Sequence, residues 1–101
     1  MRDREWLNAE LKKICPNVYY KAPKNINFKY PCIKYKETGI ENISYSDNKP
    51  YKFHHTYEVI AMYTDPNLDI ADEILLAIPY SDPVRAYEYK GVYHYVFKIK
   101  I

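Results

Sequence analysis

A chain of 101 residues is long enough for one domain with a single hydrophobic core. With only 2 Gly it lacks the Gly-rich loops that cradle phosphates, and its net charge of +2 does not by itself indicate nucleic-acid binding. It has 13 Tyr, a residue suited to half-buried strands and interfaces, and no apolar run near the ~20 residues of a membrane span.

The first predicted element is a helix over residues 4–14. Apolar residues there recur at helical spacing, as at Leu7 and Leu11. Asp3 is a suitable N-cap, and Pro16 disfavours helical geometry at the residue before it. We therefore expect the helix to end just before Pro16.

Two short strands and a long loop are expected next. Residues 17–20 and 30–36 are strand candidates, with Pro31 at the start or on an edge because it donates no ladder hydrogen bond. Residues 37–50 contain two clusters of turn-forming residues. We expect them to form a long hairpin or a protruding loop.

The strongest strand signal covers residues 51–63. Large apolar residues alternate along one face of this segment. The other face is polar in its first half and apolar at Ile60 and Met62. We therefore expect the second half of the strand to be covered on both sides and the first half to project outward.

A second helix and a terminal hairpin complete the chain. Ile70, Ile74 and Ile78 form an apolar stripe in a helix predicted over residues 67–78. Strands are expected over 84–89 and 92–101, joined at Lys90-Gly91. The order α-β-β-β-α-β-β predicts a single α+β domain over residues 1–101, with an antiparallel sheet and both helices packed on one face.

The sequence contains no constellation that indicates catalysis, a metal or a cofactor. Cys15 and Cys32 are too few for a disulfide framework, so we expect reduced, partly buried thiols in a reducing cytoplasm. His54 and His55 are adjacent on a strand and should point to opposite faces, away from a shared metal ion. Nothing positive supports an enzyme.

A basic and aromatic run leaves a nucleic-acid-binding module as one alternative. Between Tyr19 and Lys36 the chain has several lysines, interleaved aromatic residues and no acidic residue. Cations that contact phosphates and rings that stack on bases are the usual means of holding single strands. The candidate residues for this alternative are Lys21, Lys24, Lys29, Lys34 and Lys36. The other interpretation is a solvated lysine face beside core tyrosines.

The favoured hypothesis is an assembly surface on the protruding loop. Aromatic and amphipathic residues on projecting segments and strand edges are suited to contacts between subunits. The candidate contact residues are Tyr45, Asp47, Asn48, Lys49, Tyr51 and His54.

Several short segments, taken in order, carry a resemblance to a known family. They are Asn17-Val18-Tyr19-Tyr20, Tyr30-Pro31-Cys32-Ile33-Lys34-Tyr35, Tyr45-Ser46-Asp47-Asn48-Lys49-Pro50-Tyr51, Asp65-Pro66 with Asp69-Ile70, Leu76-Ala77-Ile78-Pro79-Tyr80 and Tyr93-His94-Tyr95-Val96-Phe97. In this order and spacing the chain resembles the tail-terminator or tail-completion proteins of tailed phages and prophages of Gram-positive bacteria. The resemblance extends over nearly the whole chain, and the order of the segments carries it.

The resemblance implies a non-enzymatic structural role in the virion. Such proteins form a ring, usually a hexamer, that caps the tail tube, contacts the major tail tube protein and presents a docking face to the head-completion or connector protein. The implied location is the head–tail junction, after assembly in the host cytoplasm. A head-completion or stopper role at the same junction is the nearest alternative.

Overall fold

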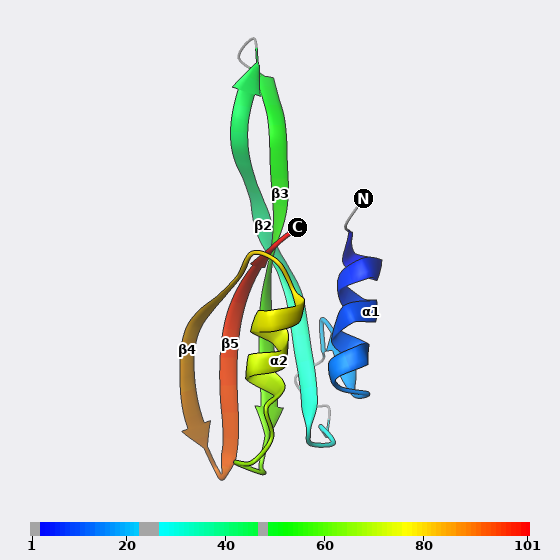
Figure 1. Cartoon of the computed structure of the whole chain (residues 1–101), viewed down its shortest axis with the longest axis vertical. Coiled ribbons are helices and arrows are strands. Elements are labelled where there is room, and N and C mark those ends of the chain that lie inside the picture. The colour runs from blue at the N-terminus through cyan, green and yellow to red at the C-terminus, as the bar shows by residue number, and fades with distance from the viewer. Residues whose placement is uncertain (1–2, 23–26, 47–48) are drawn as a thin grey trace.

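The computed structural model describes residues 3–22, 27–46 and 49–101, with residues 41–46 and 49–53 described as backbone alone. These residues form a mixed sheet and two helices, in the order predicted from the sequence (Figure 1). The elements are α1 (Arg4–Ile14), β1 (Val18–Tyr20), β2 (Cys32–Ser46), β3 (Lys49–Tyr63), α2 (Ile70–Ala77), β4 (Ser81–Tyr89) and β5 (Val92–Lys100). The α+β class is confirmed.

Helix α1 has the boundaries that its sequence signals predict. The backbone N–H of Trp6 donates to Oδ1 of Asp3 at 2.9 Å, which satisfies one of the free donors at the helix N-terminus. Leu7 and Leu11, four residues apart, are fully buried on the inner side of the helix.

The sheet has the strand order β1-β2-β3-β5-β4. The pairs β2–β3, β3–β5 and β4–β5 are antiparallel, as predicted, but β1 runs parallel to β2. A parallel pair needs a connection of about a dozen residues. The segment between Tyr20 and Cys32 supplies that length, whereas a tight turn would have forced the antiparallel arrangement.

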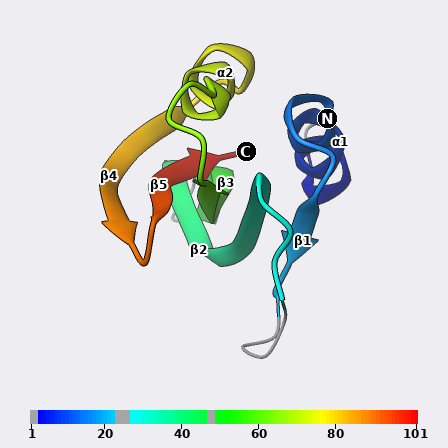
Figure 2. The same ribbon diagram turned by 90° about the horizontal axis from the view of Figure 1, so that it is seen from below.

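Both helices cover the same face of the sheet, so the main core lies between them and the strands (Figure 2). On β3 this face carries Tyr57, Val59, Ala61 and Tyr63, and on β5 it carries Phe97 and Ile99. A smaller buried cluster lies on the helix-free face, where Tyr19 and Phe28 pack against Cys32, Ile60, Met62, Val92 and Val96. Ile60 and Met62 are therefore covered on their own side, as the sequence predicts for the second half of this strand.

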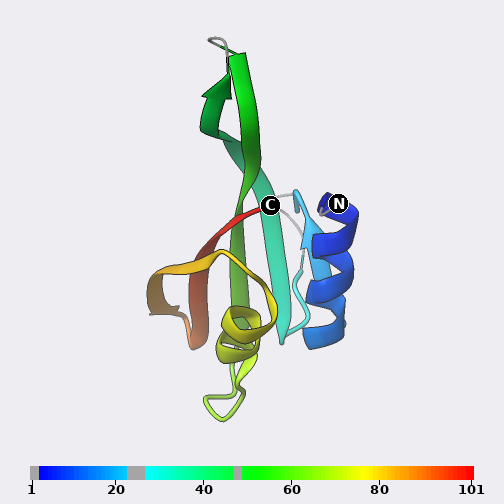
Figure 3. The same ribbon diagram turned by 45° about the horizontal axis from the view of Figure 1, so that its top comes forward.

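The long hairpin expected around residues 37–50 is present, and the strands that form it are longer than predicted. Its described residues continue β2 and β3 as a paired ribbon that projects beyond the rest of the sheet (Figure 3). The turn-forming Thr38-Gly39 pair does not end strand β2. It produces a register shift in the β2–β3 pairing between Glu37 and Gly39. Such a bulge accommodates an extra residue without ending the strand.

The last third of the chain departs from prediction only at element boundaries. Helix α2 begins at Ile70 and not at residue 67, because the N–H of Asn67 donates to Oδ1 of Asp65 at 2.9 Å in a local turn. Strand β4 begins at Ser81, earlier than predicted. Lys90 and Gly91 both have positive φ, 51° and 78°, as a two-residue hairpin turn with the twist of the strands requires.

Candidate functional site

The most distinctive feature of the molecule is the projecting β2–β3 ribbon, which we call the arm and define as residues 40–54. Strand β5 pairs with β3 from Tyr63 to Thr56, and two backbone hydrogen bonds between His55 and Ile101 extend this pairing by one residue. On the other side, β1 pairs with β2 at Ile33–Tyr35. Past these points, no other strand within the described ranges borders either edge of the arm.

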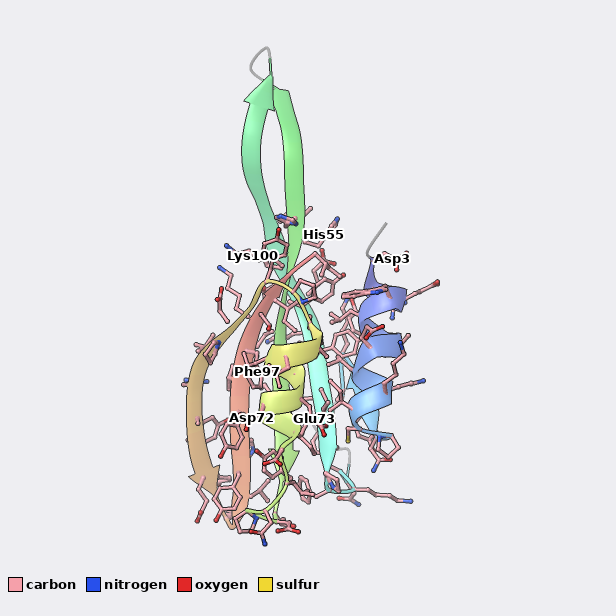
Figure 4. All side chains as sticks on the ribbon, in the orientation of Figure 1. Asp3, His55, Asp72, Glu73, Phe97 and Lys100 are labelled. Atoms are coloured by element: carbon pink, nitrogen blue, oxygen red, sulfur yellow. The ribbon has the colours of Figure 1, made fainter. Side chains whose placement is uncertain are left out.

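Polar contacts fix the place where the arm leaves the sheet. Nδ1 of His55 lies 2.5 Å from Oε1 of Glu37, and Figure 4 shows His55 at this junction. Beside it, Oγ1 of Thr38 lies 3.1 Å from Oγ1 of the buried Thr56 and donates to the Thr56 carbonyl oxygen at 3.2 Å. These bonds hold both strands on the two sides of the bulge, so they define the direction of the arm.

Three of the six predicted contact residues are brought together. Tyr45 pairs with Pro50, Ser46 pairs with Lys49, and Tyr51 follows on β3, so three of the candidates lie in the outer part of the arm. Asp47 and Asn48 lie outside the described residues.

His54 lies at the base of the arm. Its ring centroid is 5.7 Å from that of Tyr80, which precedes β4 and is 64% exposed. His55 contacts Glu37 instead, so the two adjacent histidines point to different partners, as the strand geometry predicts.

An apolar patch at the opposite edge of the sheet was not predicted. Leu75 and Val84 are exposed and line a groove of about 360 Å³ between α2 and β4. Leu76, which is 89% exposed, lies on the other side of α2, beside Lys13 and Ile14 of α1. The available signal was the run Ile74-Leu75-Leu76-Ala77-Ile78, which is apolar around more of the helix than one stripe can bury. Beside this patch, the outer edge of β4 pairs with no strand of the described residues.

The lysines of the nucleic-acid alternative divide into two groups. Lys21, Lys34 and Lys36 line one shallow groove of about 290 Å³ together with Glu58 and Ile60. Lys29 is exposed in the segment before β2, and Lys24 lies outside the described residues. Three of the five residues are therefore brought together.

Neither thiol has the environment of a nucleophile. Cys15 and Cys32 are both free and buried. Burial raises the pKa of Cys32 to about 12 and also raises the pKa of Cys15. Among the residues that the structure describes, no group of three His, Cys, Asp or Glu side chains is placed to hold a metal ion.

We expect both thiols to resist iodoacetamide at pH 8 in the native protein. A thiol with a pKa of about 12 is thiolate in only about one molecule in 10,000 at that pH, compared with about one in four for a free Cys. Mass spectrometry should show alkylation at least ~100-fold slower than in 8 M urea. Native alkylation of Cys32 at the rate of the unfolded chain would contradict the buried, protonated thiol.

No family model matches the chain, and no curated protein matches it. Neither described helix is long and apolar enough to cross a bilayer.

Proposed function

We propose that this chain is a structural subunit of a phage-type particle that assembles into a ring of the tail-terminator kind. The observation that carries the proposal is the arm. In this role the ring caps the tail tube and provides a docking face for the head connector. The subunit works through contacts between proteins and has no catalytic step.

The arm is longer than a hairpin needs to be for the fold itself. The β2 half, Ile40–Ser46, contributes about 24 Å at ~3.4 Å per residue, and the longest dimension of the chain is 51 Å. A two-stranded ribbon without further support is at best marginally stable in water, and its outer N–H and C=O groups invite another strand. A partner subunit that pairs with the arm would stabilise the ribbon and would satisfy its outer N–H and C=O groups.

A complementary surface lies at the other end of the strand order. The sheet ends at β4, whose outer edge adjoins the exposed Leu75 and Val84. Because the arm and the β4 edge are different surfaces, a contact between them is head-to-tail, and repetition with rotation closes a ring. Addition of an arm strand to β4 would bury the apolar patch and satisfy both edges.

Electron microscopy of particles made without this gene tests the proposal. The gene is deleted from the phage or prophage that carries it, and the control is the same deletion complemented with the wild-type gene. Overlong tail tubes beside unattached, DNA-filled heads support the proposal. Normal-length tails beside emptied heads assign the chain to the head side as a stopper, and a normal yield of intact virions overturns the assembly role.

A further inference from the structure

The helix-free face of the sheet collects cations from segments far apart in the sequence. The strand registers align Lys34, Ile60, Val96 and Arg85 in one row across four strands. The next row is Lys36, Glu58, Lys98 and Asp82, and Lys100 lies beyond it opposite Thr56, near the base of the arm (Figure 4). We call this surface the basic face and define it by Lys34, Lys36, Arg85, Lys98 and Lys100.

Charge is segregated onto this face. Its five cations are accompanied by two carboxylates, Glu58 and Asp82, which leaves a surplus of three positive charges. The whole chain has a net charge of +2, so the remaining residues together are slightly negative. A patch that is more positive than the whole protein attracts polyanions, although the net charge alone gives little sign of it.

Aromatic rings lie at both sides of the basic face, each beside a cation. Near β4, the guanidinium carbon of Arg85 lies 5.4 Å from the ring centroid of Tyr87, whose ring stacks on His94 at 4.6 Å and an angle of 6°. Near β1, Nζ of Lys34 lies 5.6 Å from the ring of Phe28, which meets Tyr19 edge to face at 5.3 Å. Tyr87 is 42% exposed, so His94 and Arg85 cover its side chain only in part.

We propose that the basic face binds single-stranded nucleic acid. Cations in cross-strand rows contact phosphates, and the exposed Tyr87 ring at the β4 margin stacks on a base, which is the general way in which proteins hold single strands. The rings distinguish this ligand from a polyanion without bases. The cations on β2, β5 and β4 replace the lysine run from Lys21 to Lys36 as the main contact surface. The proposal does not depend on ring assembly.

Fluorescence anisotropy with a labelled oligothymidylate of about 20 nucleotides tests this proposal. The test variant is K34E/R85E, which reverses two cations of one row on β2 and β4. The matched control is K12E/K13E on the exposed last turn of α1, which changes the net charge by the same amount. Circular dichroism confirms that both variants remain folded.

We expect K34E/R85E to weaken binding at least ~10-fold at low salt, while K12E/K13E changes it less than ~3-fold. Loss of two phosphate contacts should also reduce the slope of log K against log salt by about 1.4. Y87A should weaken binding at least ~5-fold with an unchanged salt slope, because it removes stacking and no charge.

Three results would overturn the proposal. The first is absence of binding by the wild type at low salt, and the second is equal weakening by the two charge-reversal variants. The third is unchanged binding by Y87A together with equal binding of the matching duplex or of heparin, which would show a surface for polyanions in general.

Discussion

The substitution L11A is expected to lower the free energy of unfolding by about 2–5 kcal/mol, whereas L76A should change it by less than about 0.5 kcal/mol. Both substitutions remove the same atoms from a helix. Leu11 of α1 is fully buried against the sheet, and Leu76 of α2 is 89% exposed. Loss of the Leu11 side chain leaves a cavity between α1 and the strands that neighbouring side chains fill only in part.

Urea denaturation followed by circular dichroism and by tryptophan fluorescence measures this difference. Trp6 lies on α1 beside the main core, so its fluorescence reports directly on that helix. If L76A destabilises the monomer as much as L11A, the assignment of α1 to the core and of Leu76 to the surface is wrong. If L76A leaves the monomer intact and weakens assembly, the exposed side of α2 near Lys13 and Ile14 belongs to an interface between subunits.

Local signals were enough to predict the element order and much of the core. The alternation over residues 51–63 identified β3, and the change from polar to apolar at Ile60 correctly placed a second buried cluster on the helix-free face. The cap at Asp3 and the turn at Lys90-Gly91 each depend on a few neighbouring residues, so both can be predicted directly from the sequence.

Features that depend on contacts between distant segments were not predictable in the same way. The parallel pairing of β1 with β2 depends on the path of the chain between them, and no local pattern encodes that path. The residues at Thr38-Gly39 indicated a turn, but pairing across the ribbon overrides that local preference and leaves a bulge. The basic face combines Lys34 with Arg85 and Lys98, which are more than fifty residues away along the chain.

The arm can be removed without touching the sheet that supports the core. Replacement of residues 42–53 by Asn-Gly would close the ribbon with a two-residue turn next to the Glu41–His54 pair. In Figure 1 the arm projects past the ends of β5 and α2, and the contacts of His55 with Glu37 and of Thr38 with Thr56 lie on the retained side of the cut. We therefore expect the urea midpoint to stay close to that of the wild type.

Assembly, in contrast, should fail completely in the shortened chain. If the arm pairs with the β4 edge of a neighbour, its removal takes away one of the two surfaces of every head-to-tail contact, so no ring can close. The measurement is complementation of the deletion phage, read as plaque number and tail length. We expect a folded protein that gives no plaques above the deletion background.

The double variant K49A/Y51A keeps the length of the arm and removes two candidate contact side chains. It should reduce complementation less than removal of the arm, because the paired backbone of the ribbon is still present. If the shortened protein folds and complements fully, the arm has no part in assembly, and the apolar patch beside β4 must be covered by a different surface. If K49A/Y51A is as defective as the shortened protein, the side chains at the outer end of the arm, more than its strand edges, make the contact.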